Sequence, residues 1–181
     1  MSTQSFSVFF ATLALACWAG TAMAIVLAYL HRRDPESGAG VLYGDLSRVA
    51  LWIAFAVAMT TTLGSLYYSE IAHFVPCKLC WYQRIAMYPL SITLLVGALR
   101  RDRLVWWYVV PVAALGSVIS IYHTQLQAFP SQHSSFCTTT EPCTIRYVWE
   151  FGFVSLPLMA LSAFAVIITL VLIARSAPTE S

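Results

Sequence analysis

Residues 8–30 form a run of 23 residues without a single charged side chain. A helix of that length rises about 34 Å, enough to cross the roughly 30 Å hydrocarbon core of a bilayer. Four later stretches of the chain are also long and apolar. Backbone polar groups in lipid must be satisfied within their own segment, so each stretch is expected to form an α-helix.

The composition agrees with a membrane location. Hydrophobic residues make up 59% of the 181 residues and charged residues only 10%, whereas soluble domains carry about a quarter charged residues. A soluble domain of this size could not bury so much apolar surface. We therefore expect an all-α integral membrane helical bundle that forms a single domain over residues 1–181. The predicted spans are 8–30, 49–69, 80–99, 104–123 and 153–174.

The basic residues predict the orientation of the bundle, because cytoplasmic loops carry most of the lysine and arginine in membrane proteins. With the N-terminus outside, seven of the ten basic residues fall in cytoplasmic segments. Lys78, Arg84 and Arg146 then lie on the outer side, as do two cysteine-bearing segments at 70–80 and 125–152. Disulfides persist outside the cytoplasm.

The net charge of +2 does not suggest nucleic-acid binding.

The motif PCKLC begins the third span. The spacing of Cys77 and Cys80 suits a small disulfide, a shared metal ion or a redox pair. Pro76 favours the first turn of a helix, where the helix dipole lowers a cysteine pKa. Arg84 lies four residues after Cys80, on the same helix face. Its guanidinium either needs an anionic partner, such as the Cys80 thiolate or a reduced quinone, or extends to the membrane interface.

A second cysteine pair lies in the segment before the last span. Cys137 and Cys143 flank the polar sequence TTTEP, which predicts an exposed and mobile loop. Residues 145–152 have an approximately helical apolar spacing, so we expect them to lie along the membrane surface.

Three other residues are considered for a role, and two of them allow more than one interpretation. His123, at the outer end of the fourth span, is either a simple solvated histidine or a group that contacts a quinone and handles its protons. Glu70, at the end of the second span, is more simply a surface carboxylate than a proton acceptor. Cys17 lies in the middle of the first span and is expected to be a small packing residue.

The motifs together resemble a known family. The sequence SLYYSEIAHFVPCKLCWYQRIAMYPL, then IYHT, then CTTTEPC followed by WEFGF, is similar to the DsbB family of disulfide bond formation proteins, above all its short-loop BdbC-like members. The similarity covers residues 64–170 or so. It implies a four-helix core, which leaves residues 8–30 as an extra N-terminal transmembrane helix. It also implies a multi-pass protein of a bacterial cytoplasmic membrane.

The resemblance implies an enzyme, a quinone-dependent protein-dithiol oxidase without a metal. Such an enzyme reoxidises a DsbA-like, or BdbD-like, thioredoxin-fold partner outside the cytoplasm and passes the electrons to membrane menaquinone or ubiquinone. Cys77 and Cys80 correspond to the pair near the quinone, with Cys80 facing it. Arg84 corresponds to an arginine that supports quinone reduction.

By the same resemblance, His123 corresponds to a histidine that contacts the quinone. Cys137 corresponds to the cysteine that the partner attacks, and Cys143 to its resolving mate, which exchanges with Cys77. The loop between Cys137 and Cys143 is shorter than in the proteobacterial members of the family.

Two alternative functions remain open at this point. A vitamin K epoxide reductase-like quinone oxidoreductase uses similar parts, but there the CxxC motif follows the loop pair instead of preceding it. A membrane scaffold could also hold structural zinc on the four thiolates of the two cysteine pairs.

Overall fold

The structure is a computed structural model that describes residues 3–132, 137 and 143–176. Its elements are α1 (Thr3–Arg33), α2 (Gly38–Leu66), the π-helical turn η1 (Tyr67–Ile71), α3 (Lys78–Arg100), the 3₁₀ turn η2 (Arg103–Val105), α4 (Trp106–Ala128) and α5 (Leu156–Ala174). The described residues contain no β-strand, only an isolated bridge between Glu150 and Val154. The all-α fold class is therefore confirmed.

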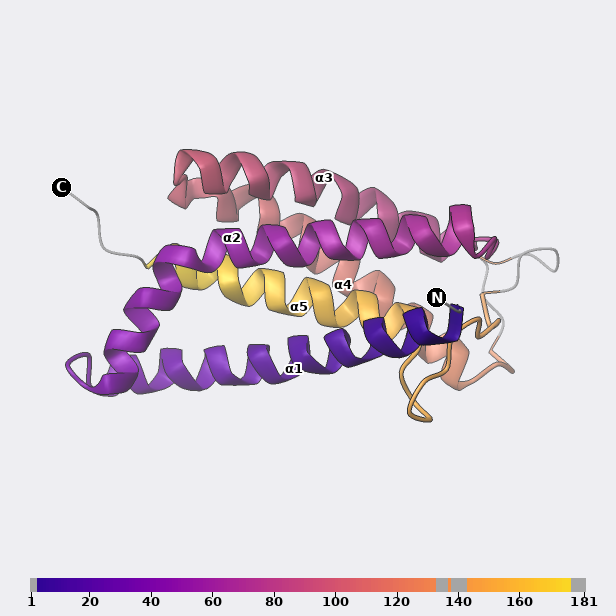
Figure 1. Cartoon of the computed structure of the whole chain (residues 1–181), viewed down its shortest axis with the longest axis horizontal. Helices are drawn as coiled ribbons and strands as arrows, with labels where there is room; N and C mark the ends of the chain where they lie inside the picture. Colours follow the sequence, from indigo (N-terminus) through magenta and orange to yellow (C-terminus); the bar gives the residue numbers. More distant parts are fainter. Residues whose placement is uncertain (1–2, 133–136, 138–142, 177–181) are drawn as a thin grey trace.

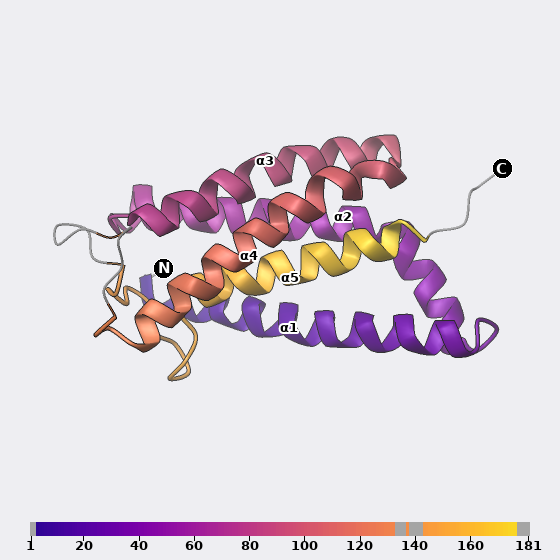
Figure 2. The same ribbon diagram turned by 180° about the vertical axis from the view of Figure 1, so that it is seen from behind.

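The helices run roughly along the long axis of the molecule, with α5 in the middle (Figures 1 and 2). α5 packs against α1, α2 and α4, while α3 lies outside them against α2 and α4. Phe164, Ile167 and Val171 of α5 are fully buried in the core. α5 therefore supplies a large part of the buried core of the bundle.

Four helical segments among the described residues are long and apolar enough to cross a membrane: α1, α2 with η1, η2 with α4, and α5. α3 has 23 residues and a comparable length, but its first turns carry Lys78, Gln83 and Arg84, which lower its mean hydropathy. The chain is a multi-pass membrane protein. Each of the five predicted spans coincides with one of these helices to within a few residues, except at the start of α2.

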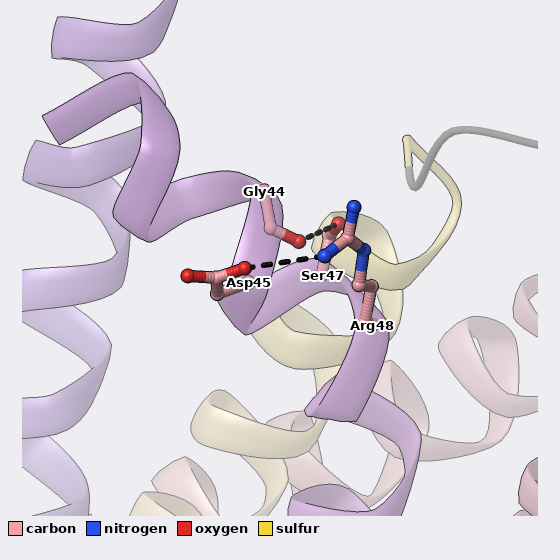
Figure 3. Close-up of polar contacts among 4 residues, drawn as sticks. All are labelled: Gly44, Asp45, Ser47 and Arg48. Atoms are coloured by element: carbon pink, nitrogen blue, oxygen red, sulfur yellow. Dashed lines mark hydrogen bonds and ion pairs between the residues drawn. The ribbon is translucent and has the colours of Figure 1, made fainter. Parts of the chain in front are cut away.

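α2 begins well before the predicted position near residue 49. The Ser37 hydroxyl caps it by accepting the N–H of Gly40 at 3.3 Å, and the first turns run across the end of the bundle before the helix turns parallel to α1 (Figure 1). Figure 3 shows two polar contacts in these turns: Ser47 Oγ donates to the Gly44 carbonyl, and Arg48 pairs with Asp45 at 3.3 Å. Asp45 and Arg48 interrupt the apolar pattern in these turns, so the predicted transmembrane span begins only after them.

The prediction of a helical surface segment over 145–152 is wrong. The backbone turns back on itself there, and Glu150 and Val154 exchange two backbone hydrogen bonds at 2.9 and 2.8 Å. Phe151 and Gly152 both have positive φ, at 53° and 79°, which ends any helical path. Of the apolar side chains in this segment Val148 is buried, whereas Ile145 and Trp149 are both more than 40% exposed.

Candidate active site

The CxxC motif caps the start of α3. Cys77 is the N-cap residue, with extended backbone (φ −71°, ψ 170°), and its sulfur accepts the backbone N–H of Cys80 at 3.4 Å. Cys80 then lies in the first turn, as predicted. Pro76 lies before the cap and outside the first turn in which it was expected, and the side chain of Cys77 provides the cap.

The two CxxC sulfurs lie 3.1 Å apart as free thiols, and Cys77 is the more buried residue. The hydrogen bond from the Cys80 thiol, together with contacts from His123, holds the pKa of Cys77 well below its ordinary value, although burial opposes that shift. Cys77 therefore has the greater thiolate character of the two residues, and thiol–disulfide exchange requires a thiolate.

His123 is buried at the end of α4 and lies between the two cysteine pairs. Its Nε2 is 3.7 Å from Cys77 Sγ and 3.2 Å from the backbone carbonyl of Cys143. Its Nδ1 is 3.4 Å from the side-chain nitrogen of Gln83, a buried residue of α3. The imidazole is 2% exposed, so the interpretation as a simple solvated histidine is wrong.

The second cysteine pair is joined in a disulfide between Cys137 and Cys143. Cys143 is buried, and both residues pack in one apolar cluster with Cys77, Cys80 and their neighbours. The sequence TTTEP, with the mobility predicted for it, lies outside the described residues.

Hydrogen bonds join the segment after Cys143 to Gln127 of α4. Gln127 donates from Nε2 to the Ile145 carbonyl at 3.0 Å, and the Gln127 carbonyl accepts two bonds from the Arg146 guanidinium, one of them from Nε at 3.0 Å. The ring of Tyr147 also stacks on Phe74, in the segment just before the CxxC motif, at 4.8 Å between ring centres. These contacts hold the disulfide over the start of α3.

Arg84 reaches across to α2. Its Nε donates to Ser65 Oγ at 2.9 Å and a terminal nitrogen donates to the Ser65 carbonyl at 3.0 Å. The guanidinium also lies 5.3 Å from the ring centre of Trp81. The anionic partner that the sequence suggested is thus replaced here by a neutral serine, which orients the cation without neutralising it.

An apolar cavity of about 310 Å³ lies among α1, α2, α3 and α5, next to the CxxC motif. Cys80, Gln83 and Arg84 line it, together with many apolar side chains. A much smaller cavity, of about 20 Å³, lies between Cys77 and Cys143 and has His123 on its wall. Among the described residues, Cys80 lines both cavities, whereas His123 lines only the small one.

The ligating atoms of Cys77, Cys80 and His123 lie within 4.8 Å of one another, close enough to share a metal ion. A four-thiolate zinc site is not compatible with this state of the molecule, because the sulfurs of Cys137 and Cys143 are bonded to each other.

The structure thus brings Cys77, Cys80, His123 and Cys143 together, and places Arg84 at the same end of the bundle but on the large cavity. Sequence reasoning missed Gln83 and Ser65. Gln83 has a detectable signal, an amide inside an apolar span and next to Arg84. Ser65 has none, since small hydroxyl residues are common in membrane helices.

Glu70 and Cys17 take no part in the cluster. Glu70 is exposed in η1 and accepts a hydrogen bond from its neighbour Ser69, which agrees with a surface carboxylate. Cys17 is half-buried in α1, where it packs against the core and lines the large cavity.

A multi-pass helical bundle with a CxxC helix start and a second cysteine pair at the same end defines a membrane protein built for thiol–disulfide chemistry. The sequence model of the family described as "Disulfide bond formation protein DsbB" matches residues 47–174. The chain belongs to the DsbB family, as its motifs predicted.

Curated relatives support this membership. "Disulfide bond formation protein C" of Bacillus subtilis (strain 168) is 41% identical over 133 residues, which is 73% of this chain and 96% of the relative. "Probable disulfide formation protein C" of Halalkalibacterium halodurans is 43% identical over 116 residues, 63% of this chain and 84% of the relative. No solved structure matches the chain.

Proposed function

We propose that this protein oxidises the dithiol of an extracytoplasmic, DsbA-like thioredoxin-fold partner and passes the two electrons to a membrane quinone. The family and its relatives support the disulfide-forming part of this proposal. One observation carries the rest: the CxxC motif lies between two different surroundings, with Cys77 facing the disulfide of the second pair and Cys80 on the wall of a large apolar cavity.

The transfer takes place in three exchanges, each of two electrons. First, a partner thiolate attacks Cys137, the disulfide with Cys143 breaks, and the second partner thiol releases the oxidised partner. The reduced pair then passes its two electrons to the Cys77–Cys80 disulfide, again through a mixed disulfide. The structure corresponds to the state after this exchange, with Cys137–Cys143 oxidised and Cys77 and Cys80 as thiols.

In the last exchange the CxxC pair is reoxidised to a disulfide, and the quinone takes up two electrons and two protons. The cavity fits a quinone as the electron-accepting substrate, because its volume is within the range of small-molecule sites and its walls are largely apolar. Arg84 would stabilise negative charge on a quinone oxygen, and Ser65 would orient its guanidinium.

His123 has a different role in this proposal from the one that the resemblance implied. Its ring lies against Cys77 and Cys143 rather than on the wall of the large cavity. We therefore assign His123 to the exchange between the two cysteine pairs, where it favours the Cys77 thiolate.

The orientation predicted from charge suits this function. With the N-terminus outside, the disulfide faces an extracytoplasmic partner and the cavity stays open to quinone in a bacterial cytoplasmic membrane. The menaquinone and ubiquinone head groups are both small enough for a site of this size.

The test is an assay with purified protein, a reduced thioredoxin-fold partner and a short-chain quinone, followed by quinone absorbance and partner thiol content. We expect one quinone reduced for each partner disulfide formed. Cys80→Ser should abolish quinone reduction, and Cys137→Ser should abolish partner oxidation. Leu99→Ala, at the far end of α3, serves as the control and should behave as wild type. Undiminished partner oxidation by Cys137→Ser would refute the assignment of the second pair.

A further inference from the structure

The helix α1 lies outside the part of the chain that matches the family, which begins at residue 47. It nevertheless packs against α2 and α5, which both line the large cavity. We propose that α1 is a wall of the quinone site, on which Leu13, Ala14 and Cys17 contact the apolar part of the bound molecule. This inference rests on the proposed quinone-linked function.

One face of α1 lines the cavity. Phe10, Leu13, Ala14 and Cys17 are spaced by three, one and three residues, so they lie on the same side of the helix. Apart from the Cys17 thiol, their side chains have no polar atoms. The hydrogen-bonding groups on the cavity come from the other helices, among them Arg84 of α3. α1 is therefore suited to bind the hydrocarbon portion of a ligand and leaves the polar portion to α2 and α3.

The outer end of α1 is fixed to the rim of the cavity. The ring of Phe6 stacks on Tyr67 of η1 at 3.9 Å, and the buried hydroxyl of Tyr68 donates to Ser7 Oγ at 3.2 Å. The Phe10 ring fits over Gly64 of α2 so closely that a Cβ added at Gly64 would lie 2.6 Å from it. These contacts give the wall a defined position instead of leaving α1 as a loosely attached helix.

Cys17 provides a direct probe of the wall, because it is the one cysteine without a disulfide partner when the other four are oxidised. The experiment measures the rate at which N-ethylmaleimide labels Cys17 in the oxidised wild-type protein, by mass spectrometry of the labelled peptide. The ligand is a short-chain quinone substituted at every ring position, so that it cannot itself react with the thiol. At ten times its dissociation constant we expect about tenfold slower labelling, since only the free protein reacts.

The matched control places the thiol on the other side of the same helix. In the variant Leu15→Cys with Cys17→Ser, the new cysteine replaces an exposed residue at nearly the same depth. Its labelling rate should not change with quinone. Protection of both thiols would show that quinone merely dissolves in the detergent or lipid, and would overturn the inference.

The outcome also separates this inference from the proposed function. If the wild-type protein reduces quinone but saturating quinone leaves Cys17 labelling unchanged, α1 is not part of the site. If the wild-type protein reduces no quinone at all, the proposed function itself fails. In a second measurement, Leu13→Phe should raise the KM for quinone, whereas Leu15→Phe should not.

Discussion

At the scale of single residues, His123 connects the two halves of the site. Its side chain contacts both Cys77 and the backbone of Cys143. A buried imidazole in this position favours the thiolate that must attack, or leave, during exchange between the two pairs. The buried Gln83 beside Nδ1 holds the ring in place.

We expect His123→Asn to raise the pKa of Cys77, because the variant loses the contacts that help to lower it. A lowered pKa keeps the thiolate populated as the pH falls, so wild-type Cys77 should remain reactive at pH values where an ordinary thiol is protonated. As the pH is lowered, Cys77 in His123→Asn should lose its reactivity at a higher pH than Cys77 in the wild type. The measurement is the pH dependence of Cys77 alkylation by iodoacetamide in the reduced protein.

The control for this measurement is His73→Asn, in the exposed loop before the CxxC motif. It should leave the alkylation profile of Cys77 unchanged. An identical profile in His123→Asn would show that the histidine does not act on Cys77.

Arg84 belongs to the quinone-facing half of the site. Replacing it with alanine should slow quinone reduction on the order of 10²-fold, as expected when a preorganised donor to a developing negative charge is removed. Exchange between the partner and the Cys137–Cys143 disulfide should be unaffected, since Arg84 lies on the other cavity. Rapid-mixing measurements of the two steps would distinguish them, and equal loss in both would contradict the assignment.

Ser65→Ala offers a graded version of the same test. It removes the hydroxyl that accepts a hydrogen bond from Arg84 Nε and retains the backbone carbonyl. We therefore expect the rate of quinone reduction to fall less than in Arg84→Ala.

At the scale of helices, close contacts between α4 and α5 set the geometry of the bundle. Gly116 of α4 faces the fully buried ring of Phe164, and a Cβ at Gly116 would lie 2.4 Å from that ring. The small residue lets the two helices approach and places the end of α4, with His123, over the start of α3.

We expect Gly116→Ala to destabilise the protein by about 1–3 kcal/mol, because a methyl group has no room in this contact. Thermal unfolding in detergent measures the change. Gly20→Ala in α1 is the matched control, since nothing lies within 4 Å of its added Cβ. Phe164→Leu should partly rescue Gly116→Ala, and a Gly116→Ala protein as stable as the control would refute this view of the packing.

The sequence predicted the helices well because long runs without charge have few alternatives in a bilayer, and Pro76 marked the start of α3. The prediction for residues 145–152 was wrong, because apolar spacing across so few residues does not distinguish a helix from an irregular loop. The sequence also could not show that His123 meets Cys143 or that Ser65 binds Arg84. Both contacts join segments distant in sequence and depend on how the helices pack.

At the scale of the whole molecule, the five α-helices of the described residues begin and finish at opposite ends of the bundle. α1 begins at the end that carries the cysteine pairs, whereas α5 finishes at the opposite end (Figure 1). Seven of the ten basic residues belong to that opposite end, so the predicted orientation has the cysteine pairs facing outward.

This orientation can be tested with single cysteines in a protein whose five native cysteines are replaced by serine. Gln4→Cys, at the start of α1, should react with a membrane-impermeant maleimide in intact cells. Glu36→Cys, in the loop between α1 and α2, should react only after the membrane is permeabilised. Both positions are exposed, so the reverse pattern would show that the bundle has the opposite orientation.

The position of the first residues of α1 has a practical consequence. They lie at the same end of the bundle as the segment that follows Cys143 (Figure 1). A thioredoxin-fold domain joined ahead of α1 by a short flexible linker would stay near the disulfide at an effective concentration on the order of millimolar. Fusion to α1 would thus turn the bimolecular encounter of the partner with the disulfide into an intramolecular reaction.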